Sequence, residues 1–270
     1  MALDFQTNRP EGAGTGGLSI ASWICYYGLT AAPERYTGAD LVVFGSRWHP
    51  PLIRTQPERP RYLGYVSIGE VDSSGEWWPE VADAPFLVRE NTRWGSWVVD
   101  VRHPGWQDLF VERIVPEILA EGFDGLFFDT MDAALSLAAW NDADTFDALR
   151  SALLEILARV RRRWPERLLA VNRGLPILDA MAPWIDILVV EGLYSTHDAE
   201  RDEYRPVDAA TQGLLLDHLA KGLHRRPDLP VLTLDYAPRP GHPLAREAVA
   251  FARSKGLVPY VSNVQLDRLD

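Results

Sequence analysis

The sequence predicts an α/β protein, and within that class a (β/α)8 TIM-type barrel that is irregular around its second and third βα units. Three observations support this fold. Short apolar runs alternate with helical segments along the whole chain, eight such runs precede residue 258, and carboxylate residues directly follow several of them. The chain has 270 residues and is 47% hydrophobic, which suits a barrel of the usual size of about 250 residues.

The predicted strands are apolar runs that are too short for helices and are bounded by Gly, Pro or charged residues. In order along the chain they are residues 20–27, 40–44, 62–68, 97–101, 123–128, 168–171, 187–190 and 231–234. A ninth run, residues 258–261, is interpreted either as an edge addition or as the strand that closes the barrel.

The predicted helices show apolar residues at helical spacing, with proline near the start or glycine at the exit. They are residues 104–121, with Pro104 in the first turn and a bend at Pro116, and residues 145–164, 207–223 and 244–255. The segments that follow the second and third strands, residues 46–60 and 73–95, lack a good helical pattern, so the ring of helices should be irregular there.

The first 17 residues are polar and rich in glycine, so we predict a disordered lead-in over residues 1–17 and a single barrel domain over residues 18–270. This lead-in has no signal-peptide core, and no apolar run approaches the roughly 20 residues of a membrane span. The sequence therefore predicts a cytoplasmic protein without a membrane partner.

The formal net charge is −11 and the pI is about 5.0, which argues against nucleic acid as a partner. Cys25 is the only cysteine, and the six histidines are scattered. Neither a cysteine cluster nor a histidine pair is available to bind a metal. We expect a monomer with no metal and no cofactor.

Polar residues follow the predicted strands at the ends that meet at the mouth of a barrel. The carboxylates among them are Glu70, Asp100, Asp129, Glu191 and Asp235, with Asn172 beside them. A single Asp at such a position is more often a helix cap, but five carboxylates together indicate an acidic pocket. Three tyrosines at the same level are expected to line it: Tyr26, Tyr65 and Tyr194.

Clustered carboxylates serve three main chemistries: divalent-metal binding, acid–base chemistry on a carbonyl substrate, and glycoside hydrolysis. The second usually needs Lys or His at the mouth, and His103 is the only candidate. The third needs two carboxylates in unequal surroundings, and Asp129 with Glu191, two βα units apart, is the best-placed pair. The sequence contains no GxSxG, HExxH or GxxxxGK[ST] motif, and no GxGxxG follows an early strand, so it does not support a serine hydrolase, zincin, P-loop or Rossmann protein.

Four segments, in this order, resemble glycoside hydrolase family 114, which includes endo-α-1,4-polygalactosaminidases. They are YLGYVSIGEVD at residues 62–72, GFDGLFFDTMD at 122–132, LLAVNRG at 168–174 and VVEGLYS at 189–195. The resemblance implies a (β/α)8 barrel that acts on α-1,4-linked galactosamine polymers. It also implies that Asp129 is the nucleophile and Glu191 the acid/base of a retaining enzyme. Many members of the family are exported, which differs from the cytoplasmic location that this sequence predicts.

On this interpretation the remaining polar residues at the mouth bind substrate. They are Tyr26, Tyr65, Glu70, Asp100, Asp132, Asn172, Tyr194 and Asp235. Two alternatives remain open from the sequence. One is a carbohydrate-binding barrel without turnover, and the other is a metal-dependent lyase or aldolase barrel whose cation is held by Glu70, Asp100 or Asp129.

Overall fold

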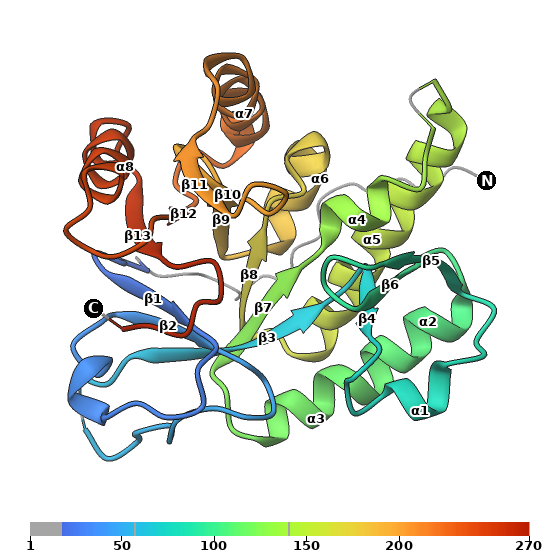
Figure 1. The fold of residues 1–270 in the computed structure, drawn as a ribbon. Coiled ribbons are helices and arrows are strands. Elements are labelled where there is room, and N and C mark those ends of the chain that lie inside the picture. Colours follow the sequence, from blue (N-terminus) through green and yellow to red (C-terminus); the bar gives the residue numbers. More distant parts are fainter. Residues whose placement is uncertain (1–17, 57, 140, 270) are drawn as a thin grey trace.

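A computed structural model of the chain describes residues 18–56, 58–139 and 141–269, so the predicted disordered lead-in, residues 1–17, lies outside the described residues. Its centre is a sheet of eight parallel strands in the order β1-β2-β3-β7-β8-β9-β12-β13 (Figure 1). These strands are β1 Trp23–Tyr26, β2 Leu41–Phe44, β3 Arg61–Ser67, β7 Gly125–Asp129, β8 Leu168–Asn172, β9 Ile187–Glu191, β12 Val231–Tyr236 and β13 Val258–Ser262.

The first and last strands of this sheet approach each other and nearly close the barrel. The indole Nε1 of Trp23 in β1 donates a hydrogen bond to the carbonyl oxygen of Val258 in β13 at 3.2 Å. The rings of Trp23 and Tyr260 pack with their centroids 5.6 Å apart. The ninth apolar run, residues 258–261, is therefore the strand that closes the (β/α)8 barrel, and not an edge addition.

The fourth predicted strand, residues 97–101, lies outside the barrel, and its placement in the barrel was wrong. Here β6 (Ser96–Val99) pairs antiparallel with β4 (Glu70–Asp72) and β5 (Leu87–Asn91). The three strands form a small sheet between β3 and β7 in the chain, and Figure 1 shows it at one side of the barrel. The apolar run is part of this insertion, where Val98 and Val99 are buried and Trp97 packs on Trp78 with ring centroids 6.2 Å apart.

The helices are α1 Trp78–Val81, α2 Pro104–Leu109, α3 Val115–Ala120, α4 Met131–Leu135, α5 Ala143–Arg163, α6 Leu178–Met181, α7 Ala209–Gly222 and α8 Pro243–Ser254. The four predicted helices agree with the observed ones within a few residues, with residues 104–121 divided into α2 and α3, while the short helices α1, α4 and α6 were not predicted. A π-helical turn, Phe110–Ile114, joins α2 to α3. It directly precedes the turn that contains Pro116, where an N–H is missing, so the bend predicted there takes the form of a wider turn.

Short polar side chains fix where the long helices begin. The carboxylate of Asp142 accepts a hydrogen bond from the backbone N–H of Thr145 at 3.0 Å, and Asp208 does the same for Thr211 at 2.9 Å. Each satisfies a backbone donor that has no partner within the helix. In the described part of the chain, no helix has the length and apolar character needed to cross a membrane.

Smaller elements complete the chain. A hairpin of β10 (Ser195–Asp198) and β11 (Glu203–Pro206) follows β9. Single 3-10 turns occupy Pro33–Arg35, Leu175–Ile177, Ala182–Trp184 and Leu223–Arg225. The hairpin and the strands β4 and β5 of the inserted sheet were missed, because these strands carry polar residues at most positions.

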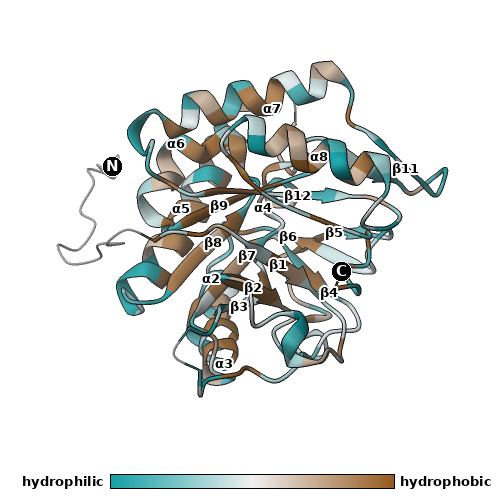
Figure 2. Cartoon of the chain, turned by 90° about the vertical axis from the view of Figure 1, so that its left-hand side faces the viewer, coloured by the Kyte–Doolittle hydropathy of each residue, from teal (hydrophilic) through white to brown (hydrophobic). Residues whose placement is uncertain are grey.

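The barrel strands are buried on both faces, so their sequences are nearly continuous apolar runs. One residue in two points into the barrel, where Cys25, Phe127, Ala170, Val189 and Leu234 pack together. The alternate residues pack against the surrounding helices, and Figure 2 shows apolar residues concentrated on the central strands. Because side chains alternate with a period of two, the next inward positions toward the mouth are those two residues further along each strand.

Candidate active site

Those inward positions line a pocket of about 480 Å³ at the carboxyl-terminal mouth of the barrel. We call it the mouth pocket. Its polar walls come from several strand ends, namely Tyr65, Glu70, Asp129, Asn172, Glu191 and Tyr236. In (β/α)8 enzymes this end of the barrel carries the chemistry.

Asp129 and Glu191 share a single hydrogen-bond donor at the bottom of the mouth pocket. The side-chain nitrogen of Asn172 donates to Oδ1 of Asp129 at 3.0 Å and to Oε2 of Glu191 at 2.6 Å. The amide must turn its nitrogen toward the pair, because its oxygen would face two acceptors. The two carboxylate oxygens are therefore no further apart than the sum of those two distances.

Tyrosine hydroxyls occupy the other side of the two carboxylates. Tyr236 donates from its hydroxyl to Oε1 of Glu191 at 2.8 Å. The hydroxyl of Tyr65 hydrogen-bonds Asp129. Each carboxylate is thus held by the same amide and by one tyrosine of its own, which fixes the orientation of both.

The backbone turns sharply directly after each of the three central residues. Thr130 follows Asp129 with φ 65°, Arg173 follows Asn172 with φ 61°, and Gly192 follows Glu191 with φ 63°. This left-handed conformation costs a non-glycine residue roughly 1–3 kcal/mol and is concentrated at functional sites. It ends each strand at the site residue and turns the chain away from the pocket.

The side chain of Thr130 supports this turn. Its Oγ1 donates to the carbonyl oxygen of Asp129 at 2.6 Å and accepts from the backbone N–H of Gly69 at 2.9 Å. The hydroxyl of Ser67 lies 2.7 Å away. These contacts connect the ends of β3 and β7 and hold Asp129 in place.

Burial and the neighbouring charge of Glu191 raise the pKa of Asp129 to about 6. Hydrogen bonds from Thr130, Asn172 and Tyr65 oppose this shift only in part. Two acidic groups in one low-dielectric pocket cannot both ionise freely, so the pair retains a proton to a higher pH than separate carboxylates would.

The inserted sheet supplies a third carboxylate to the mouth pocket. Glu70 in β4 is 7% exposed and accepts from Asn91 Nδ2 at 2.9 Å and from Ser96 Oγ at 2.6 Å. Asn91 and Ser96 belong to β5 and β6, so this insertion is part of the wall of the pocket. The prediction that Glu70 lies at the mouth agrees with its position, although β4 was not expected.

Several residues predicted for the mouth lie elsewhere. Asp100 is paired with Arg102 (Oδ1 to Nε, 2.8 Å), which lowers the pKa of its carboxyl. Asp132 pairs with Arg173 at 2.9 Å and accepts from the Gly174 N–H at 3.1 Å, so it fixes the loop after β8. Neither carboxylate lines the mouth pocket. Their positions therefore do not support the predicted contact with substrate.

Asp235 and two of the tyrosines also face away from the mouth pocket. Asp235, 1% exposed, accepts from the backbone N–H groups of Tyr194 and Ser195 at 2.7 and 2.8 Å. Burial raises its pKa to about 6. Tyr194 bonds Glu247 and packs on Phe251, and the Tyr26 hydroxyl donates to the carbonyl oxygen of Thr30. The mouth pocket is lined instead by the next residue in each case, namely Tyr27 after Tyr26 and Tyr236 after Asp235.

The structure also settles the role of His103. Its Nδ1 accepts a hydrogen bond from the N–H of Gly105 at 3.1 Å and caps α2. It lies outside the mouth pocket, which argues against the carbonyl acid–base chemistry that needed it. Among the described residues, no three His, Cys, Asp or Glu side chains are grouped so that they could hold a metal ion.

A (β/α)8 barrel with a pair of neighbouring carboxylates at its mouth is typical of barrel-shaped glycosidases. The sequence profile of glycoside hydrolase family GH114 matches residues 22–270, and the chain belongs to this family. It is a glycoside hydrolase, as the resemblance implied.

Comparisons with known structures agree with this assignment. The glycoside hydrolase domain of PelA from Pseudomonas aeruginosa is 27% identical with a TM-score of 0.78, and the match covers 93% of this chain and 98% of that one. Ega3 from Aspergillus fumigatus, solved with galactosamine, shares the fold at 14% identity and a TM-score of 0.68, over 92% of this chain and 93% of that one. An uncharacterised Deinococcus radiodurans protein is 26% identical over 235 residues, which is 83% of this chain and 71% of that protein.

Proposed function

We propose that this glycoside hydrolase cleaves α-1,4-linked galactosamine polysaccharide with retention of anomeric configuration, using Asp129 as nucleophile and Glu191 as acid/base. The observation that carries the proposal is the amide of Asn172, which bonds both carboxylates at 3.0 and 2.6 Å. The facing oxygens, Oδ1 of Asp129 and Oε2 of Glu191, can be no further apart than the sum of these two distances. This favours the carboxyl separation of about 5–5.5 Å found in retaining enzymes over the roughly 6.5–9.5 Å of inverting ones.

The charge of the mouth pocket supports an amino sugar as substrate. Its described lining includes the carboxylates of Glu70, Asp72, Asp129 and Glu191, and none of the described lining residues is Lys, Arg or His. A de-N-acetylated galactosamine unit carries an ammonium group, which such a pocket attracts. The Ega3 structure with bound galactosamine, which has this fold, is consistent with the same class of ligand.

The reaction then follows from the surroundings of the two carboxylates. Asp129 attacks the anomeric carbon while Glu191 protonates the leaving oxygen, and Glu191 afterwards takes a proton from the water that releases the sugar. The cationic substrate favours the ionised form of Asp129, which offsets the burial that raises its pKa. Tyr65 and Tyr236 hold the two carboxylates in orientation throughout.

The proposal is tested by incubating partially de-N-acetylated α-1,4-galactosaminogalactan with the protein and analysing products by mass spectrometry. Glu191→Gln and Asp129→Asn keep the side-chain size while removing the acid/base and the nucleophile. We expect cleavage by the parent and losses of at least about a thousandfold in both variants. Full activity in either variant would contradict the assigned roles. Binding of oligosaccharide without any product from the parent would favour the binding-barrel alternative.

A further inference from the structure

A second cavity, of about 410 Å³, adjoins the mouth pocket and has no role in the chemistry described so far. We call it the side pocket. It shares Tyr27, Tyr65, Ser67, Glu70 and Asp72 with the mouth pocket, so the two cavities are continuous. Its volume lies within the roughly 300–1,000 Å³ typical of pockets for small ligands.

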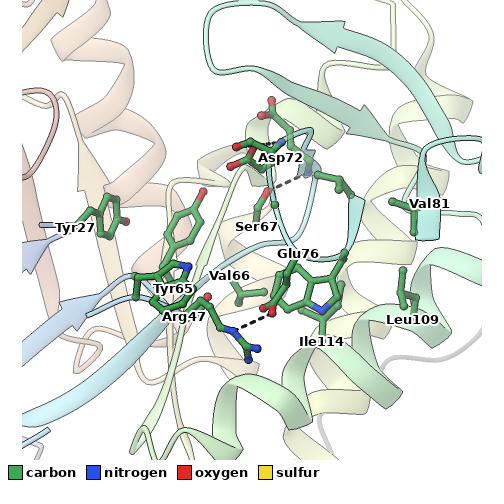
Figure 3. Close-up of a pocket in the computed structure, with 18 of the residues that line it drawn as sticks. Tyr27, Arg47, Tyr65, Val66, Ser67, Asp72, Glu76, Val81, Leu109 and Ile114 are labelled. Atoms are coloured by element: carbon green, nitrogen blue, oxygen red, sulfur yellow. Dashed lines mark hydrogen bonds and ion pairs between the residues drawn. The ribbon is translucent and has the colours of Figure 1, made fainter. Parts of the chain in front are cut away.

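The far end of the side pocket differs in chemistry from the mouth pocket. Its deep wall is apolar and includes Val66, Val81, Leu109 and Ile114 (Figure 3). Tyr27 and Tyr65, which also line the mouth pocket, lie on the opposite side from Val81 and Leu109 (Figure 3).

Arg47 is the one basic residue among the described lining residues of the side pocket, and carboxylates neutralise it. Arg47 Nε pairs with Glu76 at 3.0 Å, and Arg47 Nη1 pairs with Glu121 at 3.4 Å. Beyond this ion pair the wall of the side pocket is apolar, and an ammonium group placed against it would find no acceptor, which is unfavourable. The carboxylates of the mouth pocket, by contrast, have no basic residue among their described neighbours in the lining.

Two tryptophans frame the side pocket. Trp48 is 73% exposed, which is unusual for so large an apolar side chain, and Trp77 is held by a hydrogen bond from its Nε1 to Glu117 at 3.0 Å. Exposed indole faces are typical stacking surfaces for ligands with an apolar face and polar edges. Sugar rings have this character.

We propose that the side pocket binds an N-acetylated hexosamine unit of the polysaccharide, next to the de-N-acetylated unit held in the mouth pocket. The methyl group would pack on the apolar wall, the ring would lie on Trp48, and the second Nη of Arg47 would donate to the acetamido oxygen. This inference rests on the proposed function, and it makes the enzyme selective for the pattern of N-acetylation along its substrate.

The test is sequencing by mass spectrometry of the products from partially N-acetylated α-1,4-galactosamine polymer. With the parent, we expect N-acetyl groups to be enriched at one fixed position relative to the new chain end. Arg47→Gln and Trp48→Ala should each reduce this enrichment about tenfold, the first because it removes a charged hydrogen-bond donor and the second because it removes the stacking surface. Random acetyl positions in the parent products, or enrichment unchanged in both variants, would overturn the inference.

Matched controls separate this pocket from its surroundings. Arg159→Gln removes a surface arginine remote from both pockets, and Trp94→Ala removes an exposed indole that lines the mouth pocket alone. Both should keep the positional enrichment, and Trp94→Ala should lower the rate. If the parent releases no product, the proposed function fails, and the inference is tested by calorimetric titration with methyl N-acetyl-α-galactosaminide. Binding weakened by Arg47→Gln supports it, and equal binding of the de-N-acetylated glycoside contradicts it.

Discussion

At the scale of single residues, the amide nitrogen of Asn172 connects the two carboxylates of the site. Its hydrogen bonds of 3.0 and 2.6 Å reach Asp129 and Glu191 from one atom. Asn172 is 3% exposed and ends strand β8, and its buried side-chain oxygen has no hydrogen-bond partner among the described residues. The two hydrogen bonds place two groups of equal charge together without any cation beside them in the described lining.

Replacing Asn172 by alanine should therefore lower kcat/KM while leaving the fold intact. Hydrogen bonds to charged groups are worth about 1.5–3 kcal/mol, so we expect a loss of about 10- to 100-fold. The measurement is initial rate on de-N-acetylated galactosamine polymer. Gln107→Ala removes an amide that bonds the carbonyl oxygen of Val101 outside the pocket and should leave the rate unchanged. A normal rate for Asn172→Ala would show that the bridge has no catalytic role.

The raised pKa of Asp129 also predicts how stability depends on pH. Its folded-state pKa of about 6 lies above the ordinary aspartate value of 3.8, so the folded protein binds more protons than the unfolded chain between these pH values. Stability then falls as the pH rises through this window. Asp129→Asn should raise the free energy of unfolding by about 1–3 kcal/mol at pH 7 and change it little at pH 4, as measured by urea denaturation. An equal gain at both pH values would contradict this account.

The sequence allowed the pair Asp129 and Glu191 to be predicted as neighbours, but it did not show which residue of each strand faces the mouth. Tyr26 was chosen where Tyr27 lines the pocket, and Asp235 where Tyr236 does. The strands are buried on both faces and show no polar–apolar alternation. Side chains alternate between the two faces of a strand, so residues two apart share a face. Cys25 and Leu234 point into the barrel, and Tyr27 and Tyr236, two residues further along, therefore point the same way.

At the scale of elements, Asp235 fixes the loop that leaves β9. It accepts two backbone N–H groups of this loop, which begins directly after Glu191. Asp235→Ala would leave both donors buried without a partner, so we expect a loss of about 2–4 kcal/mol in unfolding free energy and a lower kcat. Asp235→Asn keeps an acceptor and should cost less. Equal effects of the two variants would show that these two hydrogen bonds do not hold the loop.

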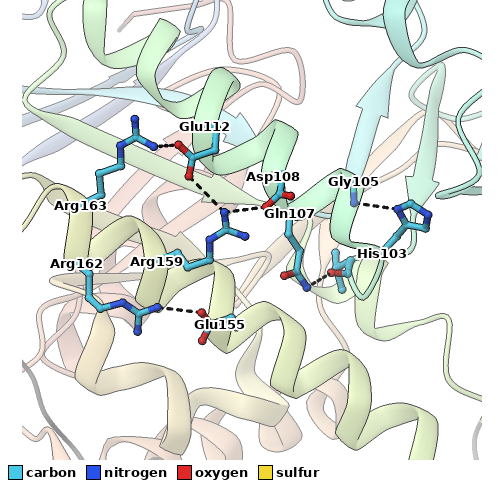
Figure 4. A network of polar contacts seen from close by, with 10 residues as sticks. His103, Gly105, Gln107, Asp108, Glu112, Glu155, Arg159, Arg162 and Arg163 are labelled. Carbon is cyan, nitrogen blue, oxygen red and sulfur yellow. Dashed lines mark hydrogen bonds and ion pairs between the residues drawn. The ribbon is translucent and has the colours of Figure 1, made fainter.

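The outer face of α5 offers a comparison between buried and exposed ion pairs. Arg161 and Asp186 pair at 2.5 Å, with 1% and 2% of each residue exposed. On the surface, Arg159 and Arg163 pair with Glu112, and Arg162 pairs with Glu155 (Figure 4). The two pairs with Glu112 connect α5 to the π-helical turn, whereas the pair of Arg162 and Glu155 lies within α5. Exposed pairs of this kind contribute little to stability.

Thermal and urea unfolding should separate the two classes. Arg161→Ala leaves a buried carboxylate without its cation, and we expect a loss of about 3–5 kcal/mol. Arg162→Ala, a matched change in the same helix, should cost at most about 1 kcal/mol. Similar losses for both variants would mean that burial of the Arg161 pair has no special role in stability.

Element prediction succeeded where periodicity is long and failed where tertiary pairing decides. The predicted helix over residues 145–164 agrees with α5 because its apolar stripe repeats over many turns. The run at residues 97–101 has the composition of a barrel strand, yet it pairs with β4 and β5. A short apolar run does not reveal its partner, because strand pairing depends on distant segments of the chain.

At the scale of the whole molecule, the eight strands of the barrel are not the eight runs counted first. One of those runs belongs to the inserted sheet, and the ninth run closes the barrel as β13. The insertion brings Glu70 to the mouth and the wall of the side pocket beside it. The inserted sheet, which a regular barrel does not have, therefore lies where the substrate contacts are proposed.

The central claim, retention by the Asp129 and Glu191 pair, is tested most directly by proton NMR of the anomeric configuration of the first product. The protein is incubated with de-N-acetylated α-1,4-galactosamine oligosaccharide and followed before mutarotation. Retention predicts that the α-anomer forms first and that Glu191→Gln forms neither anomer at a comparable rate. Initial release of the β-anomer would contradict the account, because inversion requires that water, and not Asp129, attacks the anomeric carbon on the face opposite the leaving group.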